Sequence, residues 1–287
     1  MRRANIIQKD TEQITTVEDL TGVFESIAST QVAKVKNKVE LSKEFFNLLW
    51  KRYTAIRIDP STRITYRSAD NERTKKVFII ISAEAGLSGD IDDRLIETML
   101  KDYDAATTDL IVLGTHGATQ LAQRGIEYIH HFTVPESDSY IDVSPVIEVI
   151  MPYPKAVVYY EEYVSLGVQE IKTIDLLQSI EDMSREADED TMTAEDTIFE
   201  PSLDEIADQM ETTMMTLAFS QAILESSLAQ AASRFNAMAV AKKRATELLG
   251  LYNLEFHRAK RSESDRRMRE VMVSLKKKKR RVAGGAS

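Results

Sequence analysis

The chain has 287 residues, of which 43% are hydrophobic and 29% are charged, and it carries a formal net charge of −9 and no cysteine. This composition excludes a disordered chain, a disulfide-rich scaffold, a cysteine-ligated metal site and a thiol enzyme. The longest apolar run, Val77 to Ile81, is much shorter than the roughly 18 residues that a membrane span requires, so we expect no membrane span. Acidic residues follow Arg2 and Arg3 without an apolar segment between them, so we expect no cleaved signal.

Helix-breaking residues are concentrated in the middle of the chain. All six prolines lie between residues 60 and 201, and six of the ten glycines lie between Gly86 and Gly167. Interior proline destabilises a helix by about 3 kcal/mol and interior glycine by about 1 kcal/mol. This distribution therefore predicts long helices at both ends of the chain around a globular middle.

The N-terminal end predicts one long helix over residues 1–60. Apolar residues recur in steps of three and four from Phe24 to Ile56, and Asp59-Pro60 supplies a stop signal. A helix with such a stripe buries it against a partner. The stripe comprises Phe24, Ala28, Val32, Val35, Val39, Ser42, Phe46, Leu49, Tyr53 and Ile56.

The middle, residues 74–178, alternates between apolar strand-like runs and helix-like segments. Such alternation is typical of a mainly parallel sheet with right-handed crossovers. Two continuous apolar runs are typical of strands buried on both faces, and two later runs around a short turn predict a hairpin at the edge of the sheet. The expected elements are strands at Lys76–Ser82 and Asp109–Gly114, helices from Ile91 to about Tyr103 and at Thr119–Ile126, and hairpin strands Lys155–Val164 and Val168–Leu177.

An acidic linker, residues 179–199, is expected to follow the middle. Between Ser179 and Thr197 it holds eight acids and one arginine, a composition typical of a solvated segment.

The C-terminal end predicts a second, longer helix over residues 202–282, followed by a flexible tail at 283–287. Pro201, Ser202 and Glu205 form a start signal with a capping box. A seven-residue repeat then holds for eight heptads, as in a left-handed coiled coil. Its first seam is Met210, Leu217, Leu224, Ala231, Met238, Ala245, Tyr252 and Ala259, and its second seam is Met214, Gln221, Leu228, Phe235, Lys242, Leu249, Phe256 and Glu263.

Two apolar stripes near opposite ends of one chain pair most simply with each other. We therefore class the fold as α/β, a Rossmann-like and mainly parallel sheet domain inserted between two long terminal helices that form an antiparallel coiled coil. The C-terminal helix would span on the order of 120 Å at about 1.5 Å per residue. Part of it must then extend past its partner and be unpaired or wrapped by another protein.

The turn from Ala85 to Asp90 lies between a strand and a helix, where phosphate-binding loops occur. It lacks the Lys-Ser/Thr of a P-loop and the three-glycine dinucleotide pattern, and Asp90 puts negative charge where a phosphate would approach. A tight turn or a docking surface is the favoured interpretation. An α/β nucleotide enzyme that uses Gly86 and Gly89 is the alternative.

The histidines indicate no site. His130-His131 would point to opposite sides of a strand, and the chain has no cysteine to complete a metal site. In Gly114-Thr115-His116-Gly117 no acid is placed to orient His116, so a polar loop is expected. We expect no catalytic residue, no cofactor and no metal.

The end of the C-terminal helix is basic, with twelve Lys and Arg against three acids from Arg258 to Arg281. One interpretation is a solvated helix face. A second is a coiled-coil adaptor or nucleic-acid-binding protein with a basic tip. A third is a tip that meets an acidic ring of partner protein, which the overhang favours.

Several segments resemble the gamma subunit of the rotary F-type ATP synthases, the central shaft, in a divergent bacterial form. The stretches of seven residues from Ala232 and from Phe256 stand in the register of that family's AARMVAM and YNKARQA segments. Asp196–Ser202 is similar to the family's entry into that helix, Ile81–Asp90 is similar to its glycine-containing loop, and the segment from Leu20 resembles its first helix.

The resemblance implies a non-catalytic rotor that carries torque between a membrane ring of c subunits and a catalytic ring of alpha and beta subunits, with the epsilon subunit beside the foot. It implies no bound nucleic acid and no membrane insertion, and it places the chain peripherally on the cytoplasmic face of the bacterial membrane, in the F1 complex. Implied contacts with the catalytic ring are Arg234, Arg258, Lys260, Arg261 and Asp265, and implied contacts of the foot with epsilon and the c-ring are Glu84, Gly86, Leu87 and Gly89.

Overall fold

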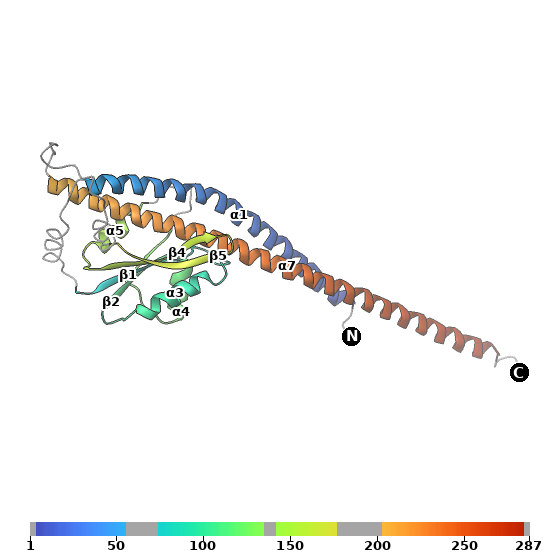
Figure 1. Cartoon of the computed structure of the whole chain (residues 1–287). Coiled ribbons are helices and arrows are strands. Elements are labelled where there is room, and N and C mark those ends of the chain that lie inside the picture. The colour runs from blue at the N-terminus through green and yellow to red at the C-terminus, as the bar shows by residue number, and fades with distance from the viewer. Residues whose placement is uncertain (1–3, 56–73, 135–141, 177–202, 284–287) are drawn as a thin grey trace. The chain divides into compact units, whose positions relative to one another are not determined.

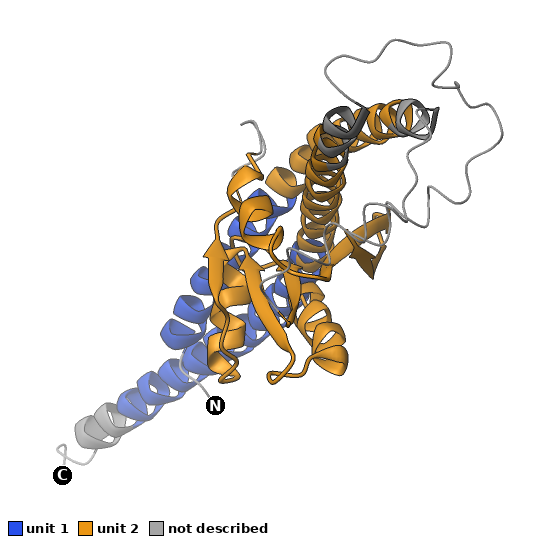
Figure 2. Ribbon diagram, turned by 90° about the vertical axis from the view of Figure 1, so that its left-hand side faces the viewer, with its two compact units in different colours: residues 1–25, 238–287 blue, residues 26–237 orange. Residues whose placement is uncertain are grey.

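A computed structural model describes residues 4–55, 74–134, 142–176 and 203–283 of the chain (Figure 1). The chain divides into two compact units, coloured separately in Figure 2. The first unit comprises residues 1–25 and 238–287, and the second comprises residues 26–237. The predicted stop at Asp59-Pro60, the start at Pro201-Ser202, the linker at 179–199 and the tail at 284–287 lie outside the described residues.

Long helices form both ends of the chain, as the distribution of proline and glycine predicts. Helix α1 (Ala4–Ala55) has 52 residues and helix α7 (Leu203–Ala283) has 81 residues. Of the predicted N-terminal stripe, Ala28, Val35 and Val39 are buried, whereas Phe24 is 37% exposed and lies outside the buried face. The buried face continues through Thr21 and Ile7 instead, and a polar residue in the series hides this continuation from a hydrophobic pattern.

The stripes of the two helices contact each other within each unit. In the second unit, Val35 and Val39 of α1 form a cluster with Leu228 of α7. In the first unit, Ala4 and Ile7 of α1 form a cluster with Ala259 of α7, and Tyr252 and Phe256 pack against it.

Two of the polar residues that interrupt the second seam of α7 find partners on α1. Lys242 Nζ donates to Glu25 Oε2 at 2.9 Å. Glu263 Oε1 accepts a hydrogen bond from the backbone N–H of Ala4 at 3.4 Å. These interruptions are thus compatible with a continuous helix pair in the first unit.

A five-stranded sheet forms the centre of the second unit, in the order β3-β2-β1-β4-β5. Its first four strands are parallel and β5 runs antiparallel to β4 at the edge, which confirms the predicted hairpin. A third parallel strand was not predicted, because it has only three residues. The strands are β1 (Lys76–Ile81), β2 (Thr108–Leu113), β3 (His130–Phe132), β4 (Ala156–Ser165) and β5 (Val168–Asp175).

Helices cover both faces of the sheet (Figure 1). Alternate side chains of β1, such as Phe78 and Ile80, pack on one face against α3 (Ile91–Asp102) and α4 (Thr115–Gln123). The side chains between them pack on the other face against α5 (Ser144–Ile150) and α7. Helix α4 begins four residues before its predicted start, and the short α5 was not predicted from the sequence.

Candidate partner-contact site

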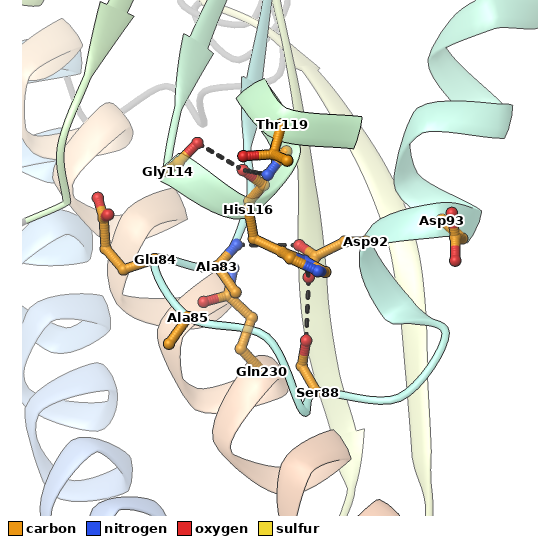
Figure 3. A network of polar contacts seen from close by, with 12 residues as sticks. Ala83, Glu84, Ala85, Ser88, Asp92, Asp93, Gly114, His116, Thr119 and Gln230 are labelled. Atoms are coloured by element: carbon orange, nitrogen blue, oxygen red, sulfur yellow. Dashed lines mark hydrogen bonds and ion pairs between the residues drawn. The ribbon is translucent and has the colours of Figure 1, made fainter. Parts of the chain in front are cut away.

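The candidate site lies where the parallel strands β1 and β2 end, at the turn of residues 82–90 (Figure 3). In open α/β sheets, ligands bind outside the carboxyl ends of the strands, at the point where the strand order reverses. Here the chain leaves β1 toward β2 through α3 and enters β4 from α5 on the other face, so that point lies between β1 and β4. The contacts and burial of the residues at this edge therefore show whether it is free to bind a ligand.

Asp92, in the first turn of α3, organises the turn. Its side chain is 1% exposed, and Oδ1 accepts a hydrogen bond from the backbone N–H of Ala83 at 2.9 Å. Asp92 Oδ2 lies 2.8 Å from His116 Nδ1 and also accepts a hydrogen bond from Ser88 Oγ at 3.0 Å (Figure 3). The expectation that no acid orients His116 is therefore wrong.

The arrangement of Ser88, Asp92 and His116 is structural and lacks the geometry of a catalytic triad. In a triad the serine hydroxyl bonds to the histidine, whereas Ser88 bonds to the aspartate and is fully buried. The remaining ring nitrogen of His116 faces Gly86, where an added Cβ would lie 3.5 Å from it. The three side chains hold the turn in one shape.

Glu84 ties together the segments that follow the three neighbouring parallel strands. Its Oε2 accepts hydrogen bonds from Thr115 Oγ1 at 2.7 Å and from the Thr115 backbone N–H at 3.3 Å. Its Oε1 accepts a hydrogen bond from the backbone N–H of Val134. Glu84, one of the implied foot contacts, thus uses both carboxylate oxygens within its own chain.

Leu87, at the tip of the turn, combines exposure with a strained backbone. Its φ is +70°, in the left-handed region, and its side chain is 56% exposed. A non-glycine residue in this conformation is destabilised by roughly 1–2 kcal/mol, and such strain is concentrated at functional sites. The strained backbone and the exposed apolar side chain together make Leu87 a candidate contact residue.

Helix α7 runs against the inner side of the turn. Ser233 Oγ donates to the backbone carbonyl of Ser88 at 2.5 Å, and Arg234 Nη2 donates to the carbonyl of Ala85 at 3.0 Å. Burial lowers the pKa of Arg234 from its ordinary value, and the nearby Asp92 carboxylate opposes that shift. At Gly89, where φ is +75°, an added Cβ would lie 3.5 Å from Ser233 Oγ, so the backbone of the turn approaches α7 closely.

Helix α7 also fills the crevice between β1 and β4. Ser226 Oγ lies 3.1 Å from the carbonyl oxygen of Ile81 and 2.8 Å from Oε2 of Glu161, which lies on β4. Gln230 Nε2 donates to the same Glu161 oxygen at 2.8 Å. Glu161 is completely buried, and its pKa is raised well above the ordinary value, first by burial and then by the charge of Asp92. The place where an α/β protein would hold a nucleotide is thus occupied by the chain's own helix.

The remaining site residues implied by the resemblance lie elsewhere on α7. Arg258, Lys260, Arg261 and Asp265 are exposed and belong to the first unit, whereas Arg234 belongs to the second. Lys260 Nζ lies 5.8 Å from the centre of the Phe256 ring. The structure therefore brings Arg234 together with the turn that contains Glu84, Gly86, Leu87 and Gly89.

Neither a metal centre nor a membrane helix is found in the part of the chain that the structure describes. The described His, Asp and Glu residues form no group of three or more that could hold a metal ion. His130 and His131 lie exposed on β3. No described helix combines the length and the apolar character that a membrane crossing requires.

The sequence is similar to those of ATP synthase gamma chains. The pattern of the family described as ATP synthase (ATP-synt) matches residues 4–273. The ATP synthase gamma chain of Clostridium novyi is 22% identical over 275 residues, which cover 93% of this chain and 95% of the relative. The ATP synthase gamma chain of Cytophaga hutchinsonii is 25% identical over 221 residues, which cover 71% and 74%.

Solved structures share the fold. A chain of the rotor of the Euglena gracilis mitochondrial ATP synthase aligns with a TM-score of 0.68 at 12% identity, over 90% of this chain and 98% of that one. A chain of the central stalk and c-ring of the Tetrahymena thermophila mitochondrial ATP synthase aligns with a TM-score of 0.57 at 14% identity, over 77% and 99%.

Proposed function

The chain belongs to the ATP synthase family, and from this premise we propose that it is the gamma subunit, the central-stalk rotor of an F-type ATP synthase. The observation that carries the proposal is the family match, which runs from the start of α1 through most of α7. The rotor is a non-catalytic component. Helix α7 occupies the crevice between β1 and β4 where a nucleotide would bind, which agrees with that role. This match does not favour the two alternatives, an α/β nucleotide enzyme and a coiled-coil adaptor or nucleic-acid-binding protein.

The proposed parts of the rotor follow the fold. Helices α1 and α7 form an antiparallel coiled coil, a proposal supported by their apolar clusters within each unit. The segment 74–178 is a Rossmann-like foot domain, supported by its parallel sheet with helices on both faces. We assign residues 1–60 to the first helix of the coiled coil, 179–199 to the acidic linker, 202–282 to the second helix and 283–287 to the tail.

The mechanism depends on asymmetric contact. The catalytic ring of three alpha and three beta subunits encloses the end of α7, and each rotational angle of the shaft favours a different conformation of each catalytic subunit. Turning the shaft then drives binding and release of nucleotide on the ring, while no bond is made or broken on this chain. The foot lies on the membrane c-ring beside the epsilon subunit, at the cytoplasmic face of the bacterial membrane.

We propose two groups of contact residues. Arg258, Lys260, Arg261 and Asp265 contact the catalytic ring, a role supported by their exposure on α7, and Arg234 belongs to the same group by resemblance. The exposed, left-handed Leu87 and the neighbouring Glu84, Gly86 and Gly89 contact epsilon and the c-ring.

Assembly tests the function. The chain should co-purify with alpha and beta subunits at one copy for each ring of three alpha and three beta subunits, and the ring should need it for sustained ATP hydrolysis. The isolated chain should not hydrolyse ATP, and ATP should not shift its melting temperature. A chain that hydrolyses ATP alone, or that does not associate with such a ring, would contradict the proposal.

A further inference from the structure

Helix α7 carries a set of polar side chains that face the foot. We define the α7 joint as Ser226, Gln230, Ser233, Arg234 and Asn236. Ser226 and Gln230 hydrogen bond Glu161 on β4. All five side chains lie within the second unit, so their contacts belong to one compact body.

The three side chains of the joint nearest the C-terminus, those of Ser233, Arg234 and Asn236, donate to backbone carbonyls in two different turns. Ser233 and Arg234 donate to Ser88 and Ala85 in the turn after β1. Asn236 Nδ2 donates to the carbonyl of Leu166, which lies in the turn between β4 and β5. Two turns that follow different strands therefore hold one short stretch of α7.

These three contacts are spread around the circumference of α7. Successive residues of an α-helix are separated by about 100° around its axis. Relative to Ser233, Arg234 therefore lies about 100° to one side and Asn236 about 60° to the other. A rotation of α7 in either sense must lengthen at least one of the three hydrogen bonds.

Much of the rest of the interface is apolar and resists rotation less. Phe219, Ile223 and their neighbours on α7 pack on the sheet, and the hydrophobic effect is non-directional and depends on buried area. Hydrogen bonds, in contrast, weaken steeply as their angle departs from linear. The acceptors are also held in place, because Asp92 fixes the turn through Ser88 and Ala83.

We propose that the α7 joint locks α7 to the foot against rotation about the helix axis, so that torque passes between them without slip. This inference rests on the proposed rotor function and names the residues that serve it. The five side chains are positioning residues that make no contact with nucleotide.

The test uses the whole ATP synthase reconstituted in lipid vesicles with this chain as its rotor. ATP hydrolysis is measured together with ATP-driven charge movement, which an oxonol dye reports whichever cation is transported. The double variant Ser233→Ala and Asn236→Ala removes two donors of the joint. The matched control, Ser227→Ala, removes the hydroxyl of a partly exposed α7 residue one position beyond Ser226.

We expect the double variant to hydrolyse ATP at about the wild-type rate but to move about twofold less charge per ATP, because two directional hydrogen bonds are lost. A general loss of stability would lower hydrolysis and transport together, so the ratio separates the joint from a structural role.

Each result decides between the two proposals. A wild-type ratio in the double variant would overturn the joint and leave the rotor function standing. If the double variant does not assemble, the single Asn236→Ala variant, which changes a partly exposed side chain, replaces it, and an unchanged ratio there overturns the joint. If the wild-type complex itself does not couple hydrolysis to charge movement, the rotor function is overturned.

Discussion

The hydroxyl oxygen of Ser226 lies 2.8 Å from Oε2 of Glu161 and joins α7 to β4 across 65 residues of sequence. The same hydroxyl lies 3.1 Å from the carbonyl oxygen of Ile81. A serine hydroxyl has one hydrogen to donate, so it cannot donate to both acceptors at once. The shorter contact, to Glu161, is the hydrogen bond that Ser226 donates, and Gln230 Nε2 donates to the same carboxyl oxygen at 2.8 Å.

The raised pKa of Glu161 predicts how stability depends on pH. Because burial raises the pKa of Glu161 above the ordinary value of 4.5, the folded chain binds this proton more tightly than the unfolded chain does. Its contribution to the free energy of unfolding is complete below that ordinary value and falls as pH rises toward the folded pKa, by at most about 1.4 kcal/mol per pH unit. Glu161→Gln should remove this slope.

Urea unfolding of the wild type and the variant at a series of pH values measures the slope. Glu162→Gln is a matched control on the neighbouring residue of β4, whose side chain is not fully buried and pairs with Lys172 at 3.6 Å. Parallel pH curves for the wild type and Glu161→Gln would show that folding does not raise the pKa of Glu161.

Close backbone packing beside Ser82 predicts severe effects of small substitutions. A Cβ added at Gly117 would lie 2.2 Å from Ser82 Oγ, and one at Gly114, where φ is +97°, would lie 2.2 Å from the Ser82 carbonyl oxygen. Gly125 has a φ of +72° but nothing within 4 Å of an added Cβ. We expect Gly125→Ala to lower the free energy of unfolding by about 1 kcal/mol, and Gly114→Ala and Gly117→Ala to lower it by about 3 kcal/mol or more.

Thermal and urea unfolding of the three alanine variants separate backbone strain from steric clash. Equal losses of the free energy of unfolding for Gly114→Ala and Gly125→Ala would mean that the backbone at Ser82 moves away from residue 114 without loss of stability. The close packing of Ser82 argues against this outcome.

Leu87 predicts a variant that separates stability from assembly. Glycine adopts a positive φ without a steric penalty, so Leu87→Gly should change the stability of the isolated chain by only about 0.5 kcal/mol. Loss of the exposed apolar side chain should nevertheless weaken binding to the other rotor subunits by about 1–2 kcal/mol. The matched control is Ile129→Gly in the loop before β3, where an apolar residue is 43% exposed. Equal binding by the wild type and Leu87→Gly would exclude Leu87 from the interface.

The pair Glu25 and Lys242 predicts a measurable coupling within the first unit. The two side chains are 24% and 46% exposed and their charged atoms lie 2.9 Å apart. A double-mutant cycle of Glu25→Gln and Lys242→Met should give a coupling of about 0.5–1 kcal/mol that decreases at high salt. A coupling of zero at low salt would mean that the pair contributes nothing to the register of α1 and α7.

Local patterns in the sequence predicted the periodic elements well. The absence of proline and the scarcity of glycine near both ends predicted α1 and α7, and the apolar runs at Lys76–Ser82 and Asp109–Gly114 predicted β1 and β2 to within one residue at each end. Such patterns are informative because a residue that recurs at the helical or strand period is buried on one face throughout its own segment. Helix α5 and strand β3 are too short to show a period.

The contacts of the site depended on the tertiary structure. Asp92 lies 24 residues from His116, and Glu161 lies 65 residues from Ser226, so no local spacing in the sequence relates them. They meet because parallel strands bring their carboxyl ends to one edge of the sheet, and because α7 returns across that edge. The longer helices and strands were therefore determined by the sequence alone, through the energy of burying one face of each segment, whereas the partners of each buried polar group were decided only when the segments packed together.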